Sequence, residues 1–244
     1  MIRTIEEQAL NAWPARQQLF YDGWVLRFAN GYTKRANSVN PLYPGDGRPV
    51  AQKIEHCLKL YEAAQMPAVF RLTPLAEPED LDAQLAARGF VKQSLTSVQI
   101  IALEGLSTIA SPNFHFWPTF SSAWAAEFER LHGPTANSAA HRAILQAILP
   151  SRCFATLTVA EVVACGLAVL ENDRVGLFDI VTAASQRRRG FGQALILNML
   201  HWAKTQGATT AYLQVETGNQ PALALYKKIG FRELYRYWYR VQEA

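Results

Sequence analysis

Cysteine is scarce in this chain: only three occur among its 244 residues. They are Cys57, Cys153 and Cys165, and they form neither a CxxC pair nor a spacing typical of a zinc site. Their sequence neighbours are largely apolar, so we expect buried free thiols in a reducing compartment. The scarcity therefore argues against a disulfide-stabilised extracellular module and against a cysteine-based metal site.

Long apolar runs are also lacking, so no segment is expected to cross a bilayer. The first residues, Met1 to Glu7, are charged and amphipathic and lack the apolar centre of a secretory signal. The net charge is only +4, and no basic stripe alternates with aromatic residues. These absences lead us to expect a cytoplasmic protein that binds neither membranes nor nucleic acid, and they leave a homodimer open.

Two familiar phosphate-binding patterns are absent, yet one segment has the composition of an anion site. Residues 186–192 read Gln-Arg-Arg-Arg-Gly-Phe-Gly, without the ending of a Walker loop or the spacing of a dinucleotide fingerprint. They place three cations and two glycines where an apolar helix is expected to begin. The first turn of a helix has unpaired N–H groups and a positive end, and glycine lets a phosphate approach the backbone. The segment predicts an anion-binding loop, with a solvated basic turn as the alternative.

A second segment favours the anion site over the solvated turn. A strand-like run over 211–215 leads into a helical segment that ends in Gly-Phe. With the loop, it resembles the GCN5-related N-acetyltransferases, the GNAT superfamily. That family's Arg/Gln-x-x-Gly-x-Gly/Ala loop is matched by Arg187, Gly190 and Gly192. Its Asn-x-x-Ala-x-x-Leu-Tyr-x-x-x-Gly-Phe motif is matched by Asn219, Ala222, Leu225, Tyr226, Gly230 and Phe231.

The resemblance covers roughly the second half of the chain and implies a GNAT fold. This is an α/β (α+β) fold in which helices flank a mixed, mostly antiparallel central sheet. Half of the residues are hydrophobic, and the length fits one large domain or two small ones. We expect two GNAT-like halves in tandem: a degenerate N-terminal domain over 1–104, a linker over 105–118 and a catalytic domain over 119–244.

The first half repeats the second only faintly. Aligning Gly89-Phe90 with Gly230-Phe231 places Leu85 where the second half has Tyr226. The loop before its first long helix has Asp46 where a phosphate site needs cations. We expect this half to shape the acceptor side of the cleft through polar side chains on or beside its strands. They are Arg27, Arg35, Asn37 and Ser38.

Local patterns predict the order of elements. Helices are expected over 6–20, with a break near Trp13-Pro14 left open, and over 50–65, 78–88, 119–131, 138–148, 190–206 and 219–229. Strands are expected over 24–28, 36–40, 68–72, 91–103, 153–159, 162–170, 175–181, 209–215, 231–234 and 237–241.

The resemblance implies acetyl-CoA as cosubstrate and no metal. The arginine–glycine loop would hold the pyrophosphate, and the end of the preceding strand would pair with the pantetheine amides like an added strand. The helix that begins near Asn219 would also contact the donor. The residues expected to bind it are Ile180, Val181, Thr182, Arg187, Arg188, Arg189, Gly190, Phe191, Gly192, Gln193, Asn219, Ala222 and Tyr226.

The implied chemistry is direct attack of an amine on the thioester, helped by orientation and by an oxyanion donor such as a backbone N–H near Val181. Tyr226 matches the family's general acid, because a neutral phenol can protonate the leaving thiolate. Asp179, on the same strand face as Val181 by alternation, and Glu216 are the candidate bases, and a surface role stays open for each. Four histidines lack triad or ligand spacing and are interpreted as structural: His115, His132, His141 and His201.

The sequence therefore predicts an N-acetyltransferase that moves an acetyl group from acetyl-CoA to a primary amine of a small molecule or peptide. The alternative is a non-catalytic module that senses acyl-CoA. The intact Tyr226 and Asn219 argue against that alternative.

Overall fold

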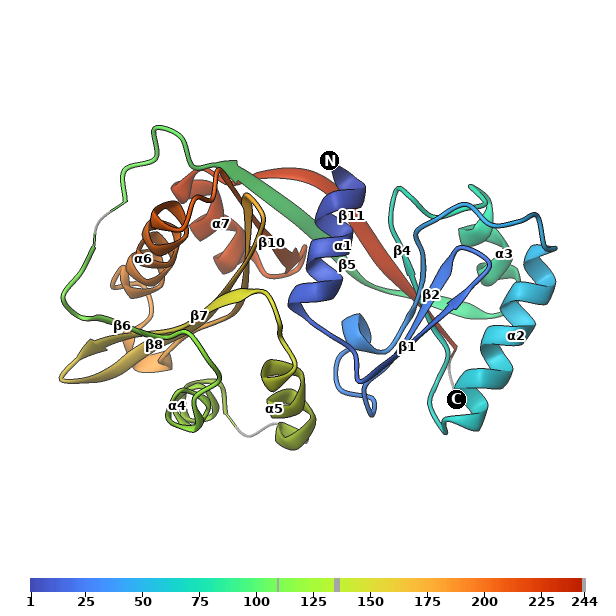
Figure 1. Ribbon diagram of the computed structural model, residues 1–244, viewed down its shortest axis with the longest axis horizontal. Helices are drawn as coiled ribbons and strands as arrows, with labels where there is room; N and C mark the ends of the chain where they lie inside the picture. The colour runs from blue at the N-terminus through green and yellow to red at the C-terminus, as the bar shows by residue number, and fades with distance from the viewer. Residues whose placement is uncertain (109, 134–136, 243–244) are drawn as a thin grey trace. The chain divides into compact units, whose positions relative to one another are not determined.

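A computed structural model describes residues 1–108, 110–133 and 137–242 (Figure 1). The chain forms two compact units. The first comprises Met1–Ser97, Glu216–Gly218 and the residues from Tyr235 onward, and the second comprises Val98–Val215 and Asn219–Leu234. Each combines helices with a mixed, mostly antiparallel set of strands, so the predicted fold class is confirmed.

The first unit is built around the strand order β1-β2-β3-β4-β11. Its elements are α1 (Ile2–Ala12), β1 (Gln17–Tyr21), β2 (Trp24–Phe28), η1 (Lys34–Ala36), β3 (Val39–Pro41), α2 (Val50–Ala63), β4 (Val69–Leu72), α3 (Leu81–Ala87), the start of β5 (Phe90–Ala102) and most of β11 (Arg232–Gln242). Only β3 and β4 run parallel among the registered pairs of this unit's described strands. Its core joins Trp24, Phe70 and Phe90 to Tyr61 of α2 and Leu85 of α3.

The second unit has the strand order β5-β10-β9-β8-β7-β6. Its elements after β5 are β6 (Phe114–Trp117), α4 (Ser122–His132), α5 (Ser138–Gln146), β7 (Ser151–Val159), β8 (Glu161–Glu171), β9 (Arg174–Thr182), η2 (Ala184–Gln186), α6 (Phe191–Thr205), β10 (Thr210–Glu216) and α7 (Gln220–Ile229). The strands β6 to β9 pair antiparallel in sequence order, and β10 runs parallel to β9.

Alternating residues of β7 divide the second unit's core between two faces of the sheet. Cys153 and Ala155 pack in one cluster with Leu195 of α6. Phe154, between them, packs instead against Trp124 of α4, with ring centroids 5.1 Å apart. Helix α6 therefore covers one face, and α4 and α5 cover the other (Figure 1).

The two units share an order of elements, but their last strands are exchanged along the chain. In the first, β1, β2 and β3 pair antiparallel, and α2 leads into β4, which is parallel to β3. In the second, β7, β8, β9, α6 and β10 repeat that order. The next neighbour of β4 is β11, from the end of the chain, whereas the next neighbour of β10 is β5.

This exchange shifts the domain boundaries from the expected ones. The first unit ends at Ser97, inside β5, rather than at residue 104, and the chain returns to it from Tyr235. The expected linker over 105–118 contains β6, which pairs antiparallel with β7. A segment flanked by prolines can still supply a short edge strand, because an edge needs only one row of hydrogen bonds.

Two local expectations were also wrong. The helix expected over 6–20 ends at Ala12, at the break left open near Trp13-Pro14, and Gln17–Tyr21 forms β1 instead of continuing it. Pro14 is the physical reason, because proline interrupts a helix and disfavours helical backbone at the preceding residue. The two strands expected at the C-terminus form one continuous strand, β11. The other predicted helices and strands correspond to observed elements, with bounds shifted by a few residues.

All three cysteines are buried free thiols, as expected. Burial raises the pKa of Cys57 and of Cys165 to about 12 and raises that of Cys153 further. Because the thiolate is the reactive form, Ellman's reagent should label none of the three in the native protein within minutes and all three after unfolding in guanidinium. Rapid labelling of one native equivalent, relative to free glutathione, would contradict this arrangement.

Candidate active site

The arginine–glycine segment forms a left-handed turn that opens α6. Arg188 and Gly190 have φ angles of 61° and 86°. Left-handed residues in a turn aim successive N–H groups toward one side, as in backbone nests that bind anions. The Gly190 carbonyl accepts the Ala194 N–H at 2.9 Å, so the N–H groups just before Ala194 belong to the first helical turn. The structure thus brings free donors and cations together at one helix end.

The three arginines of this loop are exposed and held only loosely. Arg187 Nε donates to the Thr182 carbonyl at 3.4 Å. Arg189 Nη1 donates to Gln186 Oε1 at 2.5 Å, and its guanidinium carbon lies 5.4 Å from the centre of the Phe191 ring. Guanidinium groups placed in this way can turn toward a phosphate without breaking buried contacts.

Gly192 lets the loop lie close to two other predicted site elements. A Cβ atom at this position would sit 3.2 Å from Thr182 Oγ1 and 3.4 Å from Leu225 Cδ2. The first turn of α6 therefore meets the end of β9 and the middle of α7. A larger side chain would push these three elements apart.

The end of β9 has one paired and one open edge. Val181 and Thr182 pair with Cys165 and Ala164 of β8. On the other edge, the registered pairing with β10 ends at Leu177, whereas β9 continues to Thr182. Ile180 and the two residues after it are half-buried. An edge of this kind can accept an extended amide chain as an added strand.

The N-terminus of α7 carries the second predicted motif. Asn219 Oδ1 accepts the Ala222 N–H at 3.2 Å and so caps the helix. Because Oδ1 caps the helix, the amide nitrogen of Asn219 is the atom that would make the expected contact with acetyl-CoA. Asn219 is exposed and Ala222 is half-buried, whereas the loop residue Gln193 is half-buried at the start of α6.

Tyr226 lies on the inward side of α7. Its side chain is buried, and its ring lies 6.0 Å from that of Phe231 at an angle of 64°. Burial raises the pKa of the Tyr226 hydroxyl to about 12, because the phenolate would be poorly solvated there. The hydroxyl therefore keeps its proton at neutral pH, as a general acid requires.

A β-bulge re-aims Asp179, the first candidate base. Phe178 pairs with Leu167, and Val181 pairs with Cys165. Between these two pairs, β9 therefore has one more residue than β8, which defines a β-bulge. Asp179 lies in that interval with a φ of 48°. Alternation between Leu177 and Asp179 therefore stops at the bulge, whereas Ile180 again packs on the α6 side, so the shared face of Asp179 and Val181 stays a prediction.

The re-aimed carboxylate meets a residue that the sequence treated as structural. Asp179 Oδ2 lies 2.7 Å from Nε2 of His141, on α5. Val175 and Leu177, earlier on β9, pack instead in the cluster with α6. No spacing in the sequence links His141 to Asp179, since 38 residues separate them and only the tertiary fold brings α5 to β9.

The role of Glu216 as the other candidate base stays a prediction. Glu216 is exposed at the end of β10 and groups with the first unit, whereas Asp179 and Tyr226 belong to the second. Among the described residues, its carboxylate has no side-chain partner, in contrast to that of Asp179.

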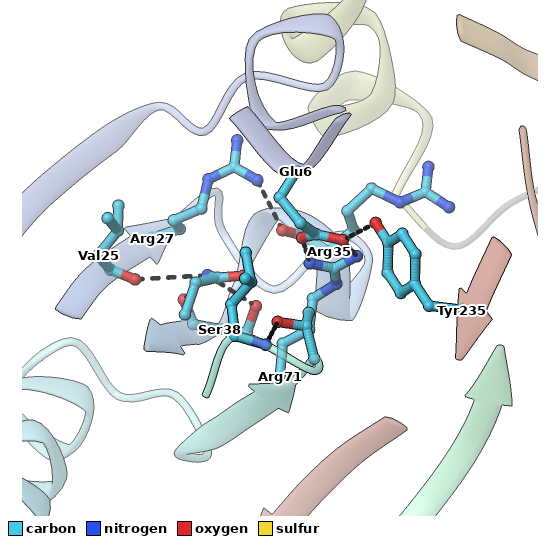
Figure 2. A network of polar contacts seen from close by, with 10 residues as sticks. Glu6, Val25, Arg27, Arg35, Ser38, Arg71 and Tyr235 are labelled. Carbon is cyan, nitrogen blue, oxygen red and sulfur yellow. Dashed lines mark hydrogen bonds and ion pairs between the residues drawn. The ribbon is translucent and has the colours of Figure 1, made fainter. Parts of the chain in front are cut away.

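The expected acceptor contacts of the first half are wrong for most of the named residues. Arg27 is fully buried and donates to the carbonyls of Leu10 and Trp13. It also donates to the Arg35 carbonyl (Figure 2). Burial lowers the pKa of the Arg27 guanidinium to about 9. These carbonyls satisfy the charge internally, so the side chain holds α1 and η1 in place and does not face a substrate.

Asn37 and Ser38 are buried for similar reasons. Asn37 Oδ1 accepts the N–H groups of Ala29 and Gly31, and Nδ2 donates to the carbonyls of Tyr32 and Thr33. Its full hydrogen-bonding capacity therefore stabilises one loop.

Ser38 is also fully buried, and its carbonyl accepts the Arg27 N–H at 3.1 Å. Arg35 lies over the Trp13 ring, 5.6 Å from its centre. Polar residues on or beside the strands were therefore wrongly expected to contact the acceptor, because a buried polar network has the same residue composition as a binding surface.

Comparison with known proteins covers nearly the whole chain. A family model described as "Probable histone acetyltransferase Rv0428c C-terminal" matches residues 1–240. The uncharacterized N-acetyltransferase YobR of Bacillus subtilis is 30% identical over 250 residues, which is 99% of this chain and 98% of YobR. The chain belongs to this acetyltransferase family, within the GNAT superfamily.

Solved structures agree with this GNAT assignment. A GCN5-related N-acetyltransferase from Kribbella flavida superposes with a TM-score of 0.72 at 17% identity, over 99% of this chain and 95% of the other. A tandem GNAT protein from the clavulanic acid biosynthesis pathway gives a TM-score of 0.68 at 12% identity, over 98% and 88%. At these identities, the likeness establishes the fold alone.

A shorter match involves a GNAT enzyme with a named acceptor. The ribosomal protein bS18-alanine N-acetyltransferase of Salmonella typhimurium is 36% identical over 61 residues, which is 25% of this chain and 41% of that enzyme. The family and its relatives are named as N-acetyltransferases, and so this GNAT protein is an N-acetyltransferase. That finding favours catalysis over the alternative of a non-catalytic sensor.

Among the residues that the structure describes, no helix is long and apolar enough to cross a membrane. Nor do three or more histidine, cysteine, aspartate or glutamate side chains gather there as a group able to hold a metal ion.

Proposed function

We propose that this GNAT enzyme transfers an acetyl group from acetyl-CoA to a primary amine of a small molecule or peptide. The observation that carries the proposal is the left-handed loop at Arg188 and Gly190, which opens α6 beside the unpaired edge of β9. An anion site and an amide-pairing edge in one place suit a ligand with a pyrophosphate and a pantetheine arm.

The residues present fit such a donor. The N–H groups from Arg188 to Gly192 would bind the pyrophosphate, and the loop arginines would add charge-assisted hydrogen bonds. The open edge at Ile180 to Thr182 would pair with the amides of the arm. Acetyl-CoA would supply an activated acetyl group as its thioester.

The remaining chemistry concerns three proton transfers. The acceptor enters as an ammonium ion, and the Asp179 carboxylate would accept the first proton from its nitrogen, directly or through a water. The Tyr226 hydroxyl, which burial keeps protonated, would give its proton to the departing sulfur. The second proton, which the nitrogen loses as the amide forms, would restore the Tyr226 hydroxyl directly or through a water. Holding both reactants in this geometry supplies much of the rate enhancement.

Acetyl-CoA at a hundredfold excess over its dissociation constant should stabilise the fold by about 2.7 kcal/mol. For a chain of this size, that is several degrees in melting temperature. Absence of a shift at millimolar acetyl-CoA would overturn the proposal. Thiol release with amino acids, polyamines, aminoglycosides and peptides then identifies the acceptor class.

Reversing two charges in the loop, Arg187→Glu with Arg189→Glu, should abolish the thermal shift. Both side chains are exposed, so the fold should survive, while the new carboxylates repel the phosphates. Isothermal titration should give one acetyl-CoA per chain for the unmodified protein and no measurable binding for the variant.

The matched control is Arg232→Glu, which reverses an exposed arginine of the same unit on β11. It should bind acetyl-CoA normally. Equal loss of binding in the control would assign the effect to net charge rather than to the loop.

We also infer that the first unit is a GNAT-like half without a donor site. The shared order of β1 to β4 and β7 to β10, with α2 and α6 in matching places, supports a tandem origin. Leu85 is buried in the core at the position that corresponds to Tyr226. In the loop that corresponds to the donor loop, the Asp46 N–H donates to Asp22 Oδ1 at 2.5 Å. A titration stoichiometry of two would contradict this inference.

A further inference from the structure

His141 is held against Asp179 by a hydrogen bond and by its own packing. Nε2 lies 2.7 Å from Oδ2, and the two side chains are 3% and 15% exposed. The imidazole also lies against Phe128 of α4, with ring centroids 5.1 Å apart at 54°. Phe128 in turn stacks on Trp124 at 5.3 Å. The ring therefore has little freedom to turn away from the carboxylate.

The helix that carries His141 is fixed to α4 by a second polar contact. Arg142 Nε and Nη2 donate to the two oxygens of Glu129 at 3.0 and 2.9 Å. The Arg142 guanidinium holds the pKa of Glu129 below its usual range. The acidic neighbour of His141 on α4 thus has an arginine partner of its own, and Arg142 fixes the helix from which His141 reaches Asp179.

The chemistry of the pair fixes which atom donates. An ionised carboxylate can only accept, so the shared hydrogen lies on His141 Nε2. The bond uses Oδ2 and leaves Oδ1 of Asp179 as the oxygen that can take a further hydrogen. Asp179 is partly exposed, whereas His141 is buried, so the carboxylate is the member of the pair that solvent reaches more readily.

We propose that His141 is a positioning residue that holds Asp179 for deprotonation of the acceptor amine, an inference that rests on the proposed function. The proton leaves the ammonium nitrogen for Asp179 Oδ1, directly or through a water, and the nitrogen lone pair is then free to attack. The imidazole remains a donor to Oδ2 throughout. The bulge and the His141 contact together give the carboxylate one orientation, which suits a primary ammonium group and disfavours an uncharged acceptor.

Two substitutions test whether the donor atom matters. His141→Leu removes the donor and should lower kcat/KM for the best amine of the thiol-release screen about 10²-fold, a loss typical of a misplaced reacting group. His141→Gln keeps an N–H donor near the position of Nε2 and should retain activity within several-fold of the unmodified enzyme. The KM for acetyl-CoA should be unchanged in both variants.

The matched control is His132→Gln. His132 stacks on the same Phe128 ring at 5.2 Å but is exposed and lies on α4. Its substitution should leave kcat/KM unchanged. Full activity of His141→Leu, or equal loss in the leucine and glutamine variants, would overturn the positioning role.

A readout without turnover keeps the proposal testable if the leucine variant does not fold. Nitrogen NMR of the unliganded enzyme should show a proton on His141 Nε2 that exchanges slowly with solvent. Asp179→Asn should change that signal, whereas His132→Gln should not. An unprotonated Nε2, or a signal unaffected by Asp179→Asn, would overturn the pair. If the unmodified enzyme releases no thiol with any amine yet shows this signal, the proposed function fails while the hydrogen bond stands.

Discussion

Replacing Tyr226 with phenylalanine should lower kcat about 10²-fold while leaving acetyl-CoA affinity nearly unchanged, the low end for loss of a general acid. The change deletes only the hydroxyl. The ring contact with Phe231, at 6.0 Å between centroids, should persist and keep α7 in place. Steady-state kinetics with a saturating amine, together with isothermal titration of acetyl-CoA, separate the two effects.

The control for this substitution is Tyr61→Phe. Tyr61 is another buried tyrosine, and its hydroxyl donates to the Arg27 carbonyl at 2.9 Å in the first unit. It should lose some stability but no turnover. A Tyr226→Phe enzyme with unchanged kcat, where chemistry limits the rate, would show that Tyr226 is not the acid.

The pH dependence of Tyr226 has a definite sign. Its pKa is raised from 10.0 to about 12, so the neutral phenol is present in both folded and unfolded chains below pH 10. Its contribution to stability is complete there and is lost as the pH rises from about 10 through 12. A basic limb of the kcat profile below pH 10 must therefore come from another group.

Replacing Arg71 with methionine should destabilise the protein by about 3–5 kcal/mol, the usual cost of leaving one member of a buried ion pair alone. Arg71 and Glu6 are almost completely buried and paired, and the Tyr235 hydroxyl donates to the same carboxylate (Figure 2). The guanidinium also lies 3.7 Å from the centre of the Tyr237 ring. For a chain of this length, the loss corresponds to a decrease of roughly 6–20 °C in melting temperature.

The double substitution Glu6→Gln with Arg71→Met should recover part of that stability, because no unpaired charge remains. As a control, Arg240→Met removes an arginine whose pair with Asp82 is partly exposed, and it should cost less. Urea unfolding measures all three variants. A loss below about 1 kcal/mol for Arg71→Met would show that water reaches the buried carboxylate.

Local sequence was informative wherever a backbone or helix property sufficed. The apolar periodicity of α6 and α7, and the glycines that begin and end them, located both helices to within a residue or two. The arginine–glycine loop was predictable because its cations and glycines are consecutive in the chain. Tyr226 and Asn219 were predictable because they lie seven residues apart on one helix and its cap.

Contiguous motifs and the family resemblance they carry therefore sufficed to predict the GNAT fold class, which is confirmed, and to name the donor loop and the candidate acid, which stay predictions. Only the tertiary structure decided the exchange of β5 and β11 between the units, because strand partners far apart in the chain leave no local pattern. It also decided the bulge that re-aims Asp179 toward His141, since one extra residue in β9 reverses the alternation on which a sequence argument depends. The burial of Arg27 and Asn37 was decided in the same way, because polar side chains reveal whether they face a ligand or a backbone carbonyl only once the chain is folded.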